Sequence, residues 1–180
     1  EQDYRRWKYI FKNYKGGNLL DAGCLDSPIT SWAKEKYPNS DIWGIDIASG
    51  AIKEMKTRFP LINFDVRDLY ETKFADEYFD AIILGEVLEH LKDVYSAILE
   101  TKRILKPGGR IIVSVPKNEA IEPGAVDKER HLNSFETNDF HKLAEGWAEV
   151  IKSKTLGSKW FPIYSYCFPQ LIVVIKKNES

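Results

Sequence analysis

The sequence predicts an α/β protein with a doubly wound, mostly parallel sheet between two helix layers. Three observations lead to this fold class. Strand-like and helix-like segments alternate along the 180 residues, as they do in repeated β–α units. Segments 79–84 and 110–115 are almost entirely apolar, which is typical of parallel strands covered on both faces. The last two strand-like segments have no helix between them, so we expect them to pair antiparallel at the sheet edge.

The first expected element is an amphipathic helix at residues 3–15. Four of its aromatic residues recur with a helical period, and they are Tyr4, Trp7, Phe11 and Tyr14. Glycines follow and end the helix, and a strand is expected at 18–21. Ser27 and Pro28 begin a second helix, because serine suits the N-cap and proline suits the first helical position. That helix ends before Pro38.

The later elements follow from the same two periodicities. We expect helices at 48–58, 93–105 and 136–145, and strands at 42–46, 61–64, 79–84, 110–115, 147–155 and 170–177. Residues 106–109, Lys-Pro-Gly-Gly, separate a helix from a strand, and 118–134 are expected to form an irregular loop. The chain is predicted to be a single domain spanning residues 1–180. In it, the helix within residues 1–16 caps the ligand-binding cleft.

Charge is balanced overall and uneven along the chain. The 26 basic and 27 acidic residues give a net charge of −1, which removes the usual electrostatic signature of a duplex-binding protein. Segment 65–100 carries a net charge of −7, whereas 1–16 and 147–180 each carry +3. The balance favours a small-molecule partner over a nucleic acid. The basic, aromatic ends are the expected region for binding it.

The sequence also bears on location. No apolar run approaches the ~20 residues that span a bilayer, so we expect no membrane span. Cys24 and Cys167 lie far apart and form no CxxC pair. They are interpreted as reduced thiols, which favours a cytoplasmic protein. The first residue is Glu1 rather than Met, so the native N-terminus is expected upstream. A monomer and a homodimer both stay open.

Acidic residues accompany the carboxyl ends of the first four expected strands. They are Asp21, Asp46, Asp65 and Glu86. Ligands of open α/β sheets bind at these ends. Gly23 is followed by no further loop glycine, so the G-x-G-x-x-G pattern of dinucleotide binding is missing, and no Walker lysine supports phosphoryl transfer. The acids instead suit a ligand with a ribose, an adenine and a cationic amino group but no phosphate, such as S-adenosylmethionine.

Six segments in order carry a family resemblance. They are LLDAGC (19–24), GIDIA (44–48), FDVRDL (64–69), FDAIILGEVLEHL (79–91), LKPGGRIIVSVP (105–116) and HLNSFETNDF (131–140). Over essentially its full length the chain resembles the class I S-adenosylmethionine-dependent methyltransferases. The resemblance implies a Rossmann-like, seven-stranded, three-layer αβα fold with strand order 3-2-1-4-5-7-6. It also implies S-adenosyl-L-methionine as cofactor and S-adenosyl-L-homocysteine as product.

Residue roles follow from the same resemblance. The expected cofactor-binding residues are Asp21, Ala22, Gly23, Cys24, Asp46, Ile47, Asp65, Val66, Gly85 and Glu86. Asp21 would hold the ammonium group through water, Asp46 the ribose hydroxyls and Asp65 the adenine amino group. The Val66 amide would donate to the adenine ring, and the loop around Gly23 would lie beneath the methionine part. The backbone after the fourth strand would pass beside the sulfonium.

The first loop departs from the family pattern. Members usually carry two or three glycines there, whereas this chain has Leu25 and Ser27 at the other positions. Leu25 must therefore take a conformation that glycine adopts more cheaply, or the loop must differ. A left-handed residue other than glycine costs on the order of 1 kcal/mol, which would weaken cofactor binding.

The candidate catalytic residues are His131, Glu86 and His90, which would act as general bases if the nucleophile holds a proton. Alternatively, His131 anchors its loop, and His90 and Glu89 bond to nearby backbone. No metal is predicted as the first interpretation. The alternative is a site built from Glu86, Glu89 and His90 at i, i+3 and i+4, with His131 as a fourth ligand. This set is similar to that of the small-RNA 3′-terminal 2′-O-methyltransferases.

The predicted function is in-line transfer of a methyl group to an oxygen or nitrogen nucleophile of a small molecule. One alternative is a metal-dependent RNA 2′-O-methyltransferase, although the charge of −7 in segment 65–100 opposes an RNA strand. A second alternative is a non-catalytic S-adenosylmethionine-binding protein. A nucleotide oxidoreductase is disfavoured by the missing glycines.

Overall fold

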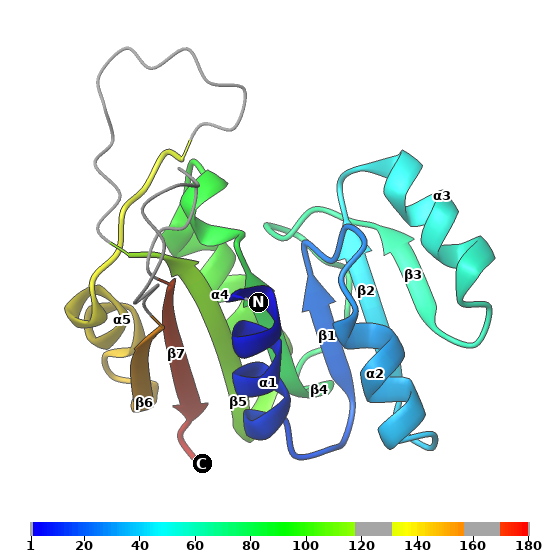
Figure 1. The fold of residues 1–180 in the computed structure, drawn as a ribbon. Coiled ribbons are helices and arrows are strands. Elements are labelled where there is room, and N and C mark those ends of the chain that lie inside the picture. The colour runs from blue at the N-terminus through cyan, green and yellow to red at the C-terminus, as the bar shows by residue number, and fades with distance from the viewer. Residues whose placement is uncertain (1, 118–130, 157–169, 180) are drawn as a thin grey trace.

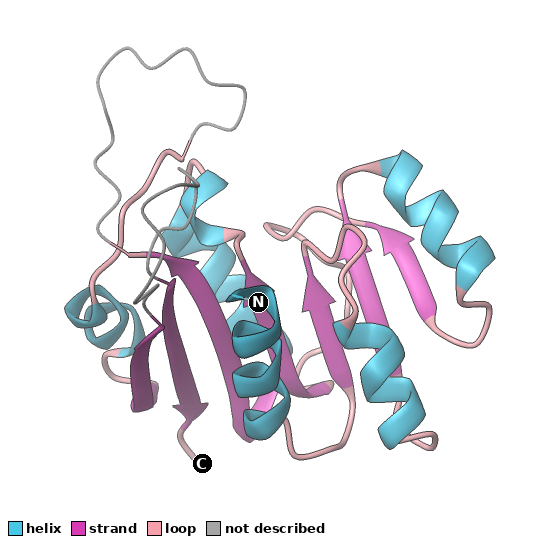
Figure 2. Cartoon of the chain, viewed as in Figure 1, coloured by secondary structure: helices cyan, strands magenta, loops and turns pink. Residues whose placement is uncertain are grey.

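The computed structural model describes residues 2–117, 131–156 and 170–179. Seven strands of these ranges form one sheet with the order β3-β2-β1-β4-β5-β7-β6 (Figure 1, Figure 2). Their bounds are β1 Leu19–Ala22, β2 Ile42–Asp46, β3 Asn63–Val66, β4 Phe79–Gly85, β5 Leu105–Pro116, β6 Ala148–Leu156 and β7 Gln170–Lys177. Strands β1 to β5 run parallel, and β7 lies antiparallel between β5 and β6. The predicted fold class, strand order and antiparallel pairing are confirmed.

Helices cover both faces of the sheet. They are α1 Gln2–Asn13, α2 Ile29–Lys36, α3 Ser49–Arg58, α4 Val94–Ile104 and α5 Thr137–Ala144, with a short 3-10 turn, η1, at Leu88–His90. Along β4, Ile82 and Leu84 pack in the core shared with α4 and α5. Ala81 and Ile83 pack in the core shared with α1, α2 and α3. This double burial explains why the strand is apolar at nearly every position.

Helix α1 packs on the sheet through Ile10 in addition to Trp7 and Phe11 of the expected stripe. Ile10 is a fully buried apolar residue of this helix, while Trp7 and Phe11 are half-buried. The Phe11 ring stacks on Trp32 of α2 with centroids 3.9 Å apart. Tyr14 lies just beyond the helix, is buried, and donates its hydroxyl to the Gly17 carbonyl at 2.6 Å. The helix is thus fixed between the sheet and α2.

Among the predicted boundaries that differ from the structure, three have a clear local reason. Strand β3 begins at Asn63 rather than at residue 61, because Leu61 is 80% exposed and the register with β2 starts at Asn63. Helix α2 begins at Ile29 and not at Pro28; the Ser27 hydroxyl still accepts from the Ile29 amide at 3.2 Å. Strand β5 begins at Leu105, so the Lys-Pro-Gly-Gly turn lies inside it, at an irregularity of its pairing with β4.

The structure bears only in part on two further predictions, the absence of a membrane span and the reduced state of the two cysteines. None of the helices in the ranges given above has the length and apolar character that crossing a membrane requires. Cys24 is a buried free thiol, whereas Cys167 lies outside the described residues. The reduced state of both thiols stays a prediction.

Candidate active site

The candidate site lies where the strand order reverses. Strands β1 and β4 are neighbours in the sheet, but the chain leaves β1 toward β2 and reaches β4 only after β3. The chain therefore leaves the carboxyl ends of β1 and β4 in opposite directions, and open α/β sheets bind ligands at such a place, here called the crevice. The N-terminal half of α1 lies at this edge of the sheet (Figure 1).

The loop after β1 is held by the end of β2. Gly23 has φ of 72°, a left-handed conformation that glycine adopts at little cost. The amides of Gly23 and Cys24 both donate to the Ile45 carbonyl, at 2.8 and 3.0 Å. The Leu25 amide donates to Asp46 Oδ2 at 3.0 Å, and the Ala48 amide donates to Asp46 Oδ1 at 2.8 Å. Asp46 therefore shapes the loop, a role that sequence reasoning missed.

Leu25 takes the conformation that the missing glycine would take. Its φ is 37° and its side chain is half exposed. The first of the two expected outcomes for this loop is therefore confirmed: the leucine adopts a left-handed backbone, at a cost on the order of 1 kcal/mol. Strain of this kind persists where surrounding contacts hold it, and here the bond to Asp46 does so.

Asp21 is a buried acid within β1. It is 2% exposed, and burial raises the pKa of its carboxyl to about 7, against the smaller lowering effect of the Ser27 hydroxyl. The charge of Asp46 raises this pKa further and that of Arg6 lowers it. Asp21 Oδ2 is buried and has no hydrogen-bond partner among the described residues. This oxygen lacks a hydrogen-bond donor, and an ammonium group could supply one directly or through a water molecule.

The ends of β2 and β3 present apolar side chains beside an acid. Ile47 is 75% exposed and Val66 is 47% exposed, and Val66 is the register partner of Asp46. Asp65 accepts from Arg67 Nε at 2.9 Å, and this bond lowers the pKa of its carboxyl. The Val66 amide donates to Asp65 Oδ1 at 3.1 Å, so both groups expected at an adenine are engaged with each other.

Glu86 lies directly after β4 in a left-handed conformation, with φ of 57°. Its amide donates to the Ser114 carbonyl at 2.9 Å, and Ser114 Oγ donates to Glu86 Oε1 at 3.1 Å. Arg6 Nη1 of α1 lies 3.5 Å from the same Oε1. Sequence reasoning missed both partners. Ser114 did leave a signal, as the one hydroxyl residue in the otherwise apolar run 111–115.

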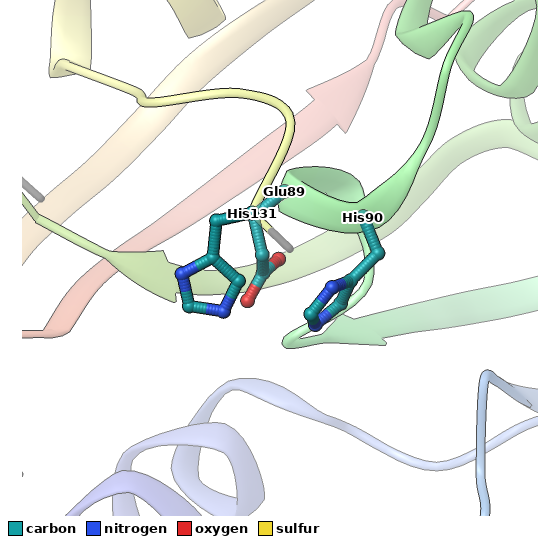
Figure 3. Close-up of side chains that lie close together, drawn as sticks. All are labelled: Glu89, His90 and His131. Atoms are coloured by element: carbon teal, nitrogen blue, oxygen red, sulfur yellow. The ribbon is translucent and has the colours of Figure 1, made fainter. Parts of the chain in front are cut away.

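Glu89, His90 and His131 converge beside this crevice (Figure 3). One ligand atom from each lies within 4.8 Å of the others. Glu89 is buried and His90 is exposed, and the two imidazole rings have centroids 4.8 Å apart. The three side chains come from η1 and from the segment before α5.

Glu86, which the alternative metal site also included, lies outside this group. The i, i+3, i+4 spacing brings three side chains together only on a continuous helix, whereas here only Leu88–His90 is helical. The chain turns at Glu86, with φ of 57°, before this helical turn begins. Its carboxylate contacts Ser114 and Arg6 instead. Of the alternative four-ligand set, the structure brings three residues together within the described chain.

Asn133 fixes the segment that follows His131 against η1. The amides of Leu132 and Asn133 donate to the Glu89 carbonyl at 2.6 and 3.1 Å. The Asn133 side-chain amide donates to the carbonyls of Leu88 and Leu91 at 3.1 and 2.6 Å. These bonds tie two segments that are some forty residues apart, and they support the loop-anchoring interpretation for this segment. Sequence reasoning did not single out Asn133, because nothing local marks a long-range anchor.

Comparisons with known sequences agree with this geometry. The sequence profile of a family described as "Methyltransferase domain" matches residues 20–113. A ubiquinone/menaquinone biosynthesis C-methyltransferase, UbiE, from Desulfotalea psychrophila is 33% identical over 115 residues, which are 62% of this chain and 47% of that protein. The chain thus matches about half the length of this relative.

Solved structures share the fold at low identity. The N-methyltransferase NodS from Bradyrhizobium japonicum superposes with a TM-score of 0.77 at 18% identity, over 99% of this chain and 97% of that one. The [4+2]-cyclase SpnF superposes with a TM-score of 0.77 at 18% identity, over 98% of this chain and 82% of that one. At this level of identity, the likeness concerns the fold alone, and the fold hosts more than one chemistry.

Proposed function

Because the chain belongs to the methyltransferase domain family, whose profile covers residues 20–113, we propose that it transfers a methyl group from S-adenosylmethionine to a small-molecule nucleophile. The observation that carries the proposal is the buried Asp21 oxygen without a partner. It lies at the reversal of strand order, where an ammonium group would complete it. Asp46 and the exposed side chains of Ile47 and Val66 suit a ribose and the face of an adenine.

Catalysis in this site would rest on positioning and charge. Methyl transfer needs the nucleophile and the methyl carbon in line, and such alignment contributes ~7–11 kcal/mol. The acids Asp21, Asp46 and Glu86 surround the crevice with negative charge, which favours a cationic cofactor. When bound, S-adenosylmethionine supplies the activated methyl group. The chain then has to orient it and keep water away.

An oxygen or nitrogen acceptor is supported by bases near the crevice. An acceptor hydroxyl or amine that holds its proton at neutral pH needs a group to remove it. His131 and His90 lie together beside β4, and Glu86 lies directly after that strand. We assign these three residues as candidate bases. A carbon acceptor, as the name of the UbiE relative suggests for that protein, is the competing outcome of an acceptor screen.

Asp46→Ala is expected to abolish binding of S-adenosylmethionine and S-adenosylhomocysteine, since it removes both the ribose acceptor and the bond to the Leu25 amide. Isothermal titration calorimetry measures this. Wild type should bind both compounds and not NAD, and Glu54→Ala, at an exposed position of α3, should bind like wild type. Tight NAD binding, or unchanged binding by Asp46→Ala, would contradict the proposal. Binding without turnover in a labelled-methyl screen would favour a non-catalytic protein.

A second candidate function is favoured by the convergence of Glu89, His90 and His131. We propose that these residues hold a divalent cation that assists transfer to a hydroxyl group. A carboxylate with two imidazoles is a donor set that first-row transition metals accept. Zinc binds imidazole nitrogen at about 2.0–2.1 Å, so donors within 4.8 Å need only small side-chain rotations. Such an ion would acidify the acceptor hydroxyl.

Metal analysis decides on this second candidate. Wild type is purified without chelators and dialysed against zinc or manganese. Inductively coupled plasma mass spectrometry is then expected to find about one bound ion per chain. Glu89→Ala should retain none. Glu86→Ala is the matched control and should retain the ion, because Glu86 lies outside the group. A wild type that holds no divalent ion ends this candidate and leaves the first one standing.

A further inference from the structure

Helix α1 brings one cation into the acidic crevice. Arg6 Nη1 lies 3.5 Å from Glu86 Oε1, and the Arg6 side chain is only 14% exposed. Its guanidinium also lies over the ring of Trp7, 4.3 Å from the centroid. A guanidinium stacked on an aromatic ring and paired with a carboxylate loses much of its freedom to move. Arg6 is therefore held at the crevice by its own helix and by the end of β4.

Arg6 also acts on the acid at the end of β1. Its charge lowers the pKa of Asp21, in opposition to burial and to the charge of Asp46. The guanidinium thus lies within electrostatic reach of both Asp21 and Glu86, the acids on either side of the reversal point. Arg5, the preceding residue on α1, is exposed and faces away from this packed side of the helix.

The acids of the crevice cannot bind one group of the cofactor, its carboxylate. The methionine end of S-adenosylmethionine carries an ammonium, a sulfonium and a carboxylate. Asp21 and Glu86 favour the two cationic groups and repel the carboxylate. A carboxylate in such a surrounding is stable only beside a cation, and a guanidinium offers it two parallel N–H donors.

We propose that Arg6 binds the α-carboxylate of the cofactor, which makes α1 part of the cofactor site. This inference rests on the proposed function and adds a residue to it. In the ligand-free protein, Glu86 holds the guanidinium at the crevice. When bound, the cofactor carboxylate would share the guanidinium with Glu86 or take its place as the partner of Arg6.

A purely structural role for Arg6 makes a different prediction. If the ion pair with Glu86 only fastens α1 to the sheet, then its loss affects every ligand of the crevice alike. The buried Ile10 and the stack of Phe11 on Trp32 hold the same helix independently. Removing the charge of Arg6 should therefore leave α1 in place and change only what the charge binds.

The test compares two ligands that differ in the amino-acid group. S-adenosylhomocysteine carries it, and 5′-deoxy-5′-methylthioadenosine keeps the adenosine and sulfur without it. By calorimetry, Arg6→Gln is expected to lower affinity for S-adenosylhomocysteine about tenfold to a hundredfold, the usual size for a charged hydrogen bond. Its affinity for methylthioadenosine should stay within about twofold of wild type, and Arg6→Lys should recover part of the loss. Arg5→Gln, the matched control, should change neither affinity.

Decarboxylated S-adenosylmethionine separates the carboxylate from the ammonium. Wild type should bind it more weakly than S-adenosylmethionine, and Arg6→Gln should cause no further loss. An equal loss of affinity for all ligands in Arg6→Gln would overturn the inference, as would unchanged affinity for S-adenosylhomocysteine. Failure of the wild type to bind any of these compounds would contradict the proposed function itself, which is a distinguishable result.

Discussion

Asp21→Asn is expected to stabilise the ligand-free protein above pH 7 and to remove a pH dependence of its stability. Burial raises the pKa of the Asp21 carboxyl from 3.8 to about 7. Between these values the folded chain keeps a proton that the unfolded chain has lost, so the free energy of unfolding falls as the pH rises. The slope approaches about 1.4 kcal/mol per pH unit. Asparagine does not ionise, so the variant lacks this slope.

Urea denaturation at pH 5 and pH 8 measures this effect. Wild type should be less stable at pH 8 than the variant, and the difference should shrink toward pH 5. Asp26→Asn, at an exposed acid of the same loop, is the control and should follow wild type. Equal pH slopes in wild type and Asp21→Asn would show that this carboxyl ionises as freely as one in solvent.

The same substitution should act in the opposite direction on cofactor binding. Only the ionised carboxylate attracts an ammonium group, so affinity for S-adenosylhomocysteine should rise with pH up to about 7 in wild type, by up to about tenfold per unit. In Asp21→Asn, affinity should be lower above pH 7 and flat with pH. A variant that is more stable and yet binds more weakly is the signature of a residue kept for its ligand.

Gly23→Ala is expected to abolish cofactor binding and to lower the free energy of unfolding. A Cβ on this residue would lie 2.4 Å from Val87 Cγ2, and φ of 72° is unfavourable for alanine. The left-handed conformation alone costs about 1–2 kcal/mol. The loop would have to move away from the residue that precedes η1. The bonds from Gly23 and Cys24 to the Ile45 carbonyl would be lost.

Gly50→Ala is the matched control for this experiment. A Cβ there meets nothing within 4 Å, and Gly50 lies in α3, where alanine is favoured over glycine by about 0.5–1 kcal/mol. Chemical denaturation and calorimetry with S-adenosylhomocysteine should show a stable, binding control and a weakened, non-binding Gly23→Ala. Wild-type affinity in Gly23→Ala would mean that the loop does not lie beneath the ligand.

The residues themselves were sufficient for the fold class and for the sheet edge at which the acids lie, and the family resemblance supplied the strand order. Apolar runs such as 79–84 must be buried on both faces, and β–α units cross over with one hand, so few topologies remain. Asp46 could be placed because the strand that ends there has clear bounds. Residues 61–64 were less informative, because Leu61 is apolar and yet exposed. The predicted strand therefore began two residues before the observed start of β3.

The details of the site depended on contacts that no local pattern encodes. The pairing of Arg6 with Glu86 joins residues eighty positions apart, and Asn133 bonds to carbonyls that lie 45 and 42 residues before it. The grouping of Glu86 with Glu89 assumed a helix that the left-handed turn at Glu86 prevents. A short motif can therefore predict which residues lie near the ligand, but not which of them point at one another.

The placement of β7 between β5 and β6 imposes an order of assembly. Strand β6 is made before β7, yet it has no sheet partner other than β7 in the described chain. Strand β6 therefore stays unpaired until β7 has formed its pairing with β5. Its centre consists of three consecutive exposed polar residues, Lys152, Ser153 and Lys154. Charged side chains of this kind discourage association of an exposed strand with other chains, so they would protect the nascent protein during that interval.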